Sequence, residues 1–65
     1  MGRYTARQVS SAPRNGFDWL VLDTETGMVA QLNGVWLEYV TEIEAEQLVA
    51  ELNRIDFEAQ DSTLQ

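Results

Sequence analysis

The stretch from residue 41 to 54, TEIEAEQLVAELNR, repeats its apolar residues with the period of an α-helix. Steps of three and four residues place these side chains on one stripe, which predicts a helix with one face against a core. The stripe consists of Ala45, Leu48, Val49 and Leu52. Thr41 is the expected N-cap, and Glu44 completes a capping box. The pattern allows two positions for the C-terminal end of the helix, a cap at Asn53 or a continuation through residues 55–58.

The residues before this helix form short runs that are rich in β-branched, aromatic and other apolar residues, as β-strands are, and residues 3–9 also alternate loosely between polar and apolar side chains. Turn-forming residues separate the runs: a cluster at 10–16 with the only proline, then the loop 23–27, then the pair Asn33-Gly34. Gly27 is expected at a positive φ, and Asn33-Gly34 is expected to form a type I′ turn. The expected strands cover residues 3–9, 17–22, 28–32 and 35–40. The sequence therefore predicts an α+β fold of ββββα order, a small antiparallel sheet of three to four strands with one C-terminal helix.

The second predicted strand is apolar on both faces. Its alternating residues are Phe17, Trp19 and Val21 on one face and Leu20 and Leu22 on the other. A single helix covers only one face of a sheet, so the second apolar set needs another explanation. Either the sheet bends strongly and encloses its own core, or an apolar patch is exposed and meets a partner. We favour the bent sheet, because an uncovered apolar face on a free monomer is a liability.

Length and composition limit the chain to one small domain. A chain of 65 residues buries only about 60% of the surface that its unfolded form exposes. Residues 1–58 are expected to form a single α+β domain, and residues 59–65 a disordered tail. The sequence has no cysteine and no histidine, and no cofactor or metal is expected. No apolar run approaches the roughly 20 residues of a membrane span, and no secretory signal is present, so we expect a cytoplasmic protein that binds no membrane.

The formal net charge is −7 at pH 7, and the acids gather in the C-terminal part. Residues 1–16 hold three arginines and no acid, whereas residues 42–65 hold seven acids and one arginine. Such a surface repels nucleic acid and attracts basic protein surfaces. We therefore expect a basic, nucleic-acid-binding protein as partner. Trp36 follows a tight turn, and tryptophan is enriched at binding hot spots. The residues expected to contact the partner are Glu42, Glu44, Glu46, Glu51, Asp56, Glu58 and Trp36.

The segment at residues 21–27, VLDTETG, resembles the first motif of the DnaQ-like 3′–5′ exonucleases, in which Asp-x-Glu at a strand end holds two divalent metals. The resemblance implies that Asp23 and Glu25 are metal ligands. It covers seven residues, and the later motifs of that family have no counterpart in this chain. The chain also lacks the histidine, cysteine or lysine that activates a nucleophile. A polar hairpin loop is therefore the expected role of this segment, and we expect a protein that is not an enzyme.

Small size, high acidity, a sheet with one helix and the lack of catalytic residues are together similar to phage-encoded anti-CRISPR proteins that imitate DNA. The resemblance is one of character across the whole chain and includes no motif. It implies a monomeric, non-enzymatic inhibitor that binds a subunit of a CRISPR surveillance complex in the host cytoplasm and blocks target DNA by charge mimicry. The alternative is a small structural or assembly protein that dimerises through an apolar sheet face or Trp36, with its acidity serving solubility.

Overall fold

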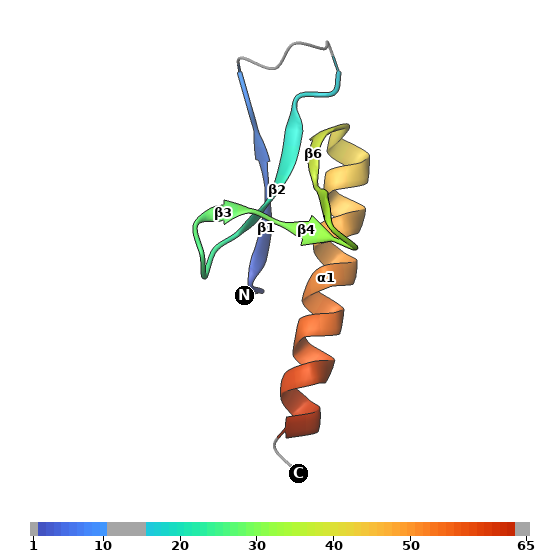
Figure 1. Cartoon of the computed structure of the whole chain (residues 1–65). Coiled ribbons are helices and arrows are strands. Elements are labelled where there is room, and N and C mark those ends of the chain that lie inside the picture. Colours follow the sequence, from blue (N-terminus) through green and yellow to red (C-terminus); the bar gives the residue numbers. More distant parts are fainter. Residues whose placement is uncertain (1, 11–15, 64–65) are drawn as a thin grey trace.

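The computed structural model describes residues 2–10 and 16–63. Within these ranges, short strand segments precede a single C-terminal helix, and the predicted α+β fold is confirmed (Figure 1). The strands are β1 (Tyr4–Gln8), β2 (Trp19–Asp23), β3 (Met28–Val29), β4 (Gln31–Leu32), β5 (Val35–Trp36) and β6 (Glu38–Val40), and the helix is α1 (Glu42–Thr63). The turn predicted at residues 10–16 falls mainly on residues 11–15, which lie outside the described residues.

Strand β2 is the centre of the main sheet. It pairs antiparallel with β1 along its whole length, from Tyr4 opposite Asp23 to Gln8 opposite Trp19. On its other edge, β3 pairs with its C-terminal end and β6 with its N-terminal end. Because β2 has neighbours on both edges, its backbone hydrogen bonds are made within the sheet, which suits a strand rich in large apolar residues.

Two of the predicted strands are each interrupted by one residue. Ala30 separates β3 from β4, and Leu37 separates β5 from β6. Both residues bind Val21 of β2: the N–H of Ala30 donates to the Val21 carbonyl, and the N–H of Val21 donates to the Leu37 carbonyl, each at 2.9 Å. The segment between them leaves the main sheet, so β4 and β5 form a separate two-stranded hairpin.

The two predicted hairpin turns have the backbone that their residues favour. Asn33 has a φ of 53° and Gly34 a φ of 79°, and Leu32 pairs with Val35 across them. Positive φ at both central residues is what a type I′ turn requires, so that prediction is confirmed. Gly27 has a φ of 74°, as predicted for the loop between β2 and β3.

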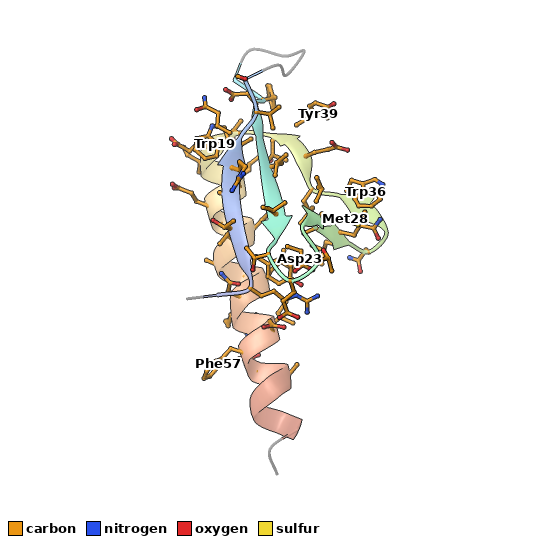
Figure 2. All side chains as sticks on the ribbon, turned by 90° about the vertical axis from the view of Figure 1, so that its left-hand side faces the viewer. Trp19, Asp23, Met28, Trp36, Tyr39 and Phe57 are labelled. Atoms are coloured by element: carbon orange, nitrogen blue, oxygen red, sulfur yellow. The ribbon has the colours of Figure 1, made fainter. Side chains whose placement is uncertain are left out.

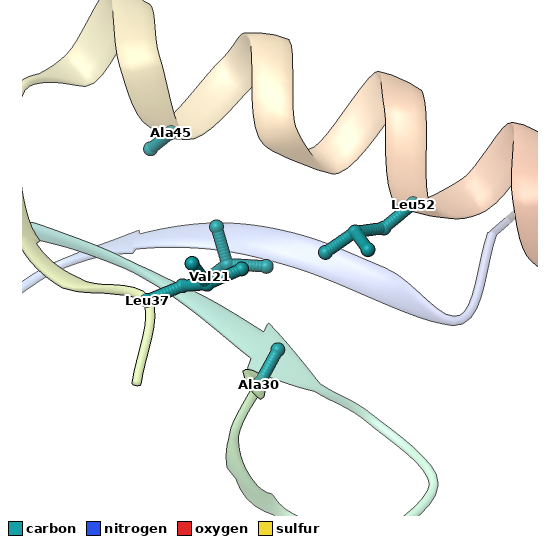
Figure 3. Packing of buried hydrophobic residues seen from close by; sticks show 5 residues of the cluster. All are labelled: Val21, Ala30, Leu37, Ala45 and Leu52. Atoms are coloured by element: carbon teal, nitrogen blue, oxygen red, sulfur yellow. The ribbon is translucent and has the colours of Figure 1, made fainter. Parts of the chain in front are cut away.

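Helix α1 covers one face of the main sheet (Figure 1). Figure 3 shows Ala45 and Leu52 pointing from the helix towards Val21, which is completely buried. The core consists of Val21, Ala30, Leu37, Ala45 and Leu52, and the half-buried Leu48 and Val49 pack against it. The predicted apolar stripe of the helix is therefore confirmed. Leu20 and Leu22 alternate with Val21, so they lie on the face that the helix leaves uncovered, where both are half-buried.

The helix begins as predicted and continues further than predicted. The Thr41 hydroxyl accepts the backbone N–H of Glu44 at 3.2 Å and donates to the Glu44 carboxylate at 3.0 Å, which confirms the N-cap. The helix passes through Asn53 and ends at Thr63. Residues 59–63, which the sequence predicts to begin a disordered tail, form the last residues of α1, and residues 64–65 lie outside the described residues. No glycine or proline follows Asn53, so nothing in the sequence stops the helix.

Asn53 joins the helix to the edge of the sheet. Its side-chain oxygen accepts the backbone N–H of Tyr4 at 2.8 Å, and its amide nitrogen donates to the Tyr4 carbonyl at 3.1 Å. These are the backbone groups that a neighbouring strand would bind, so Asn53 takes the place of a strand at this edge of β1. The paired bonds fix where along β1 the helix lies.

Candidate functional site

The acidic residues of α1 lie on two flanks of its apolar stripe. The helical period places Glu42 and Glu46 on the flank that also carries Asn53, next to β1. Glu44, Glu51 and Glu58 follow one another at seven-residue steps on the opposite flank. All five side chains are exposed. The acids predicted to bind a partner are thus divided between two sides of the helix.

Arg54 neutralises part of the negative charge on the flank that carries Glu44, Glu51 and Glu58. Its guanidinium forms ion pairs with Glu51, three residues before it, and with Glu58, four residues after it, the latter at 3.0 Å. The hydrogen bond from Arg54 holds the pKa of Glu51 below its usual range. Exposed pairs of this kind stabilise a protein little, so their main consequence is to reduce the negative charge of this flank. Glu42 and Glu46 form no ion pair with any described residue.

Asp56 is turned towards the sheet and is half-buried. Its carboxylate lies 3.5 Å from Nη1 of Arg3, an ion pair that connects the helix to the residue before β1. Arg3 also donates to Asp23 through Nε and Nη2, each at 2.9 Å, and lies 3.7 Å from the Glu25 carboxylate. One arginine therefore links the N-terminal strand, the loop after β2 and the helix. Among the acids predicted to bind a partner, Asp56 is the least accessible.

Asp23 is a buried acid, with 7% of its surface exposed. Besides the two bonds from Arg3, it accepts the backbone N–H of Glu25 at 3.0 Å. These interactions, led by the bonds from Arg3, hold the pKa of Asp23 below its ordinary value and raise that of Arg3. Both acids of the exonuclease-like segment therefore face an arginine. Among the side chains of residues 2–10 and 16–59, no three of the metal-binding types gather as a set of ligands.

Replacing Asp23 with asparagine is expected to destabilise the protein at neutral pH, because Arg3 loses a charged partner that binds it at two points. A carboxylate whose pKa falls on folding stabilises the fold above its unfolded pKa, and this contribution is lost as the pH drops through the folded pKa. The difference in unfolding free energy between wild type and Asp23→Asn should therefore be largest above pH 3.8 and shrink below it. Urea unfolding at several pH values measures this difference. A difference that persists undiminished in strong acid would contradict the assignment.

Trp36 lies on the β4–β5 hairpin, and 46% of its surface is exposed. In Figure 2 it points away from α1, on the same side of the molecule as Met28. The two residues line an open depression of about 350 Å³ that also reaches Arg3 and Asp23. Its exposure leaves Trp36 available for contact, but on a different surface from the helix acids. The predicted contact set therefore does not form one continuous site.

Several exposed apolar residues were not predicted as contacts. Met28, Tyr39 and Phe57 are 57%, 52% and 71% exposed. The register between β2 and β6 shifts at Tyr39, because Trp19 pairs with Val40 and Leu20 with Glu38. Tyr39 has a φ of 56°, so its side chain does not follow the alternation of the strand. The sequence contains no signal for this irregularity. Phe57 falls outside the apolar stripe of α1 on the helical period, which is a signal that its side chain is exposed.

Helix α1, the one helix within the described residues, does not combine the length and apolar character needed to cross a membrane. Comparisons with family models, curated proteins and solved structures found no match to this chain. The charges, exposure and contacts of the residues described above are therefore the basis on which a function is proposed.

Proposed function

We propose that the protein is a non-enzymatic inhibitor that binds a basic, nucleic-acid-binding surface of another protein through the acidic helix α1. A subunit of a CRISPR surveillance complex in the host cytoplasm is the partner that this proposal favours, with target DNA excluded by charge mimicry. The observation that supports it is the exposure of five glutamates on the flanks of α1, while Arg3 and Arg54 are engaged in ion pairs within the chain. The surface field around the helix is therefore strongly negative.

The spacing of the carboxylates sets how closely the helix resembles a duplex. Glu42 and Glu46 are four residues apart, about 6 Å along the helix axis. A duplex carries one negative charge per about 1.7 Å of its axis. A Lys/Arg-lined groove built for DNA would therefore form fewer ion pairs with α1 than with its own ligand. We expect binding to weaken with salt, with a smaller slope of log K against log salt than the same partner shows for duplex DNA.

Capture from host lysate at low salt, followed by mass spectrometry, identifies the partner. The captured protein is then purified, and its binding to this chain is measured against increasing salt and competing duplex DNA. A basic nucleic-acid-binding protein that releases this chain in moderate salt, and that DNA displaces, would support the proposal. A partner that still binds this chain in high salt, and from which duplex DNA does not displace it, would exclude charge mimicry.

Charge reversal locates the binding surface on the helix. Glu42→Lys with Glu46→Lys is expected to weaken binding by roughly tenfold or more, because close charge pairs at interfaces couple by about 1.5–7 kcal/mol. Asp18→Lys with Glu25→Lys changes the net charge equally but lies on β2's preceding loop and the β2–β3 loop, so it should retain most of the affinity. Equal losses in both double variants would show that net charge, and not α1, determines binding. Circular dichroism checks that both variants fold.

A further inference from the structure

The face of the main sheet opposite α1 carries two rows of side chains. One row crosses β1, β2 and β3, and the other crosses β1, β2 and β6. The rows follow from the register, because residues directly opposite on paired strands share a face. The first row is Thr5, Leu22 and Val29, and the second is Arg7, Leu20 and Glu38. These six residues are called the outer face. Figure 2 looks onto this side of the sheet, with α1 behind it.

The centre of the outer face is apolar, and α1, the one helix in the described part of the chain, packs against the other face of the sheet. Leu20, Leu22 and Val29 are half-buried, whereas Val21, on the other face of β2, is completely buried under α1. In a sheet with a single helix, the second face needs either polar side chains or a partner. An apolar patch bordered by charged residues is typical of a surface that binds another protein.

The charges on the outer face are balanced. Arg7 and Glu38 lie on either side of Leu20, on β1 and β6. Neither forms an ion pair with a residue in the described part of the chain, and Glu38 is half-buried. The helix acids lie on the opposite side of the sheet. The six residues of the outer face therefore add no net charge, so in a chain with a net charge of −7 a second copy meets less repulsion there than at the acidic helix α1.

We propose that the outer face is a self-association surface, on which two copies pack sheet against sheet about a two-fold axis parallel to β2 and above Leu20. This rotation stacks Leu20 on Leu20 of the second copy and sets Arg7 opposite Glu38 of the second copy, twice in the dimer. A two-fold axis perpendicular to β2 would instead set Arg7 against Arg7 and Glu38 against Glu38. The charges therefore select the first arrangement. It goes beyond the proposed function and does not depend on it, because it leaves both copies of α1 on the outside.

The size of the outer face predicts the strength of the dimer. A standard interface buries about 800 Å² on each partner, which is about a sixth of the 4899 Å² surface of this chain. Two rows of three residues provide less than that. The dimer is therefore weak and forms in a concentration-dependent way, in the micromolar to millimolar range.

Sedimentation equilibrium at low salt, from micromolar to millimolar protein, tests the proposal. The wild-type mass should rise with concentration from 7.4 kDa towards twice that value. Arg7→Glu should lower the association constant by roughly tenfold or more, because two facing pairs become repulsive. Combining Arg7→Glu with Glu38→Arg should restore it, because the facing charges are opposite again.

A second double variant controls for net charge. Arg7→Glu with Glu46→Arg also keeps the net charge at −7, one change of −2 and one of +2, but places the new arginine on α1. It should dimerise as poorly as Arg7→Glu alone. A wild-type chain that stays at 7.4 kDa at every concentration would overturn the proposal, and so would equal rescue by both double variants. Partner binding through α1 is unaffected by the Arg7 and Glu38 exchange, so the two proposals fail separately.

Discussion

Replacing Leu52 with alanine is expected to lower the free energy of unfolding by about 2–5 kcal/mol. Leu52 is 7% exposed and packs from α1 onto the core around Val21 (Figure 3). The substitution removes buried methyl groups and leaves a cavity that a sheet covered by one helix closes only in part. A domain of this length has a total stability of roughly 3–10 kcal/mol, so the loss is a large share of it. Urea unfolding followed by circular dichroism measures the loss.

Ile43→Ala is the matched control for this experiment. Ile43 lies on the same helix and is also a branched aliphatic residue, but 68% of its surface is exposed. Its replacement should change the unfolding free energy by no more than about 0.5 kcal/mol. If Leu52→Ala and Ile43→Ala lower the free energy of unfolding equally, the apolar stripe of α1 does not pack against the sheet as described. A second variant, Leu52→Met, should cost less than about 1.5 kcal/mol because it conserves volume.

The parts of the fold that were predicted correctly are those set by neighbouring residues. The helical stripe, the Thr41 cap and the Asn33-Gly34 turn each depend on residues within one or two turns of chain. The interruptions at Ala30 and Leu37 depend instead on Val21, which binds both from a different strand. Residues 28–32 form one mostly apolar run without a glycine, a proline or another turn-forming residue, so the local pattern contains no sign of the break. Contacts between distant segments decide where such strands end.

The end of the helix was missed for a different reason. Residues 59–63 lack an apolar stripe, a pattern from which the sequence predicts a disordered tail. A helix continues on backbone propensity where no residue stops it, and Glu58, Ala59 and Gln60 are all good helix formers. The absence of an amphipathic pattern therefore predicts an unpacked segment, and such a segment can still be helical.

The contacts of the candidate site also divide into those between neighbouring residues, which the sequence predicts, and those between distant segments, which it does not. The spacing of Glu51, Arg54 and Glu58 predicts their ion pairs, because residues three and four apart are neighbours on a helix. Asp56 meets Arg3 only because β1 and α1 lie side by side, a relation across 53 residues that the charge pattern does not contain. The outer face likewise needs the register of four strands, since residues such as Arg7, Leu20 and Glu38 are far apart in sequence.

Asn53 links α1 to β1 through two hydrogen bonds with the backbone of Tyr4, although the sequence also allowed it to be a helix cap. Asn53→Ala is expected to lower the free energy of unfolding by about 1–3 kcal/mol, from two lost hydrogen bonds to Tyr4. The cost appears although alanine is the better helix former by up to about 0.7 kcal/mol. Helix propensity and stability should therefore change in opposite directions in this variant.

Gln47→Ala separates the lost link from the gain in helix propensity. Gln47 is exposed on the same helix, so its replacement should leave stability unchanged or slightly raised. Hydrogen exchange gives a local reading: the Tyr4 amide should be protected in wild type and exchange faster in Asn53→Ala, with the control unchanged. Gly2→Ala should act in the same direction, because a Cβ at Gly2 would overlap the Asn53 side chain. If the Tyr4 amide exchanges equally fast in wild type and Asn53→Ala, α1 is held to the sheet by its apolar stripe alone.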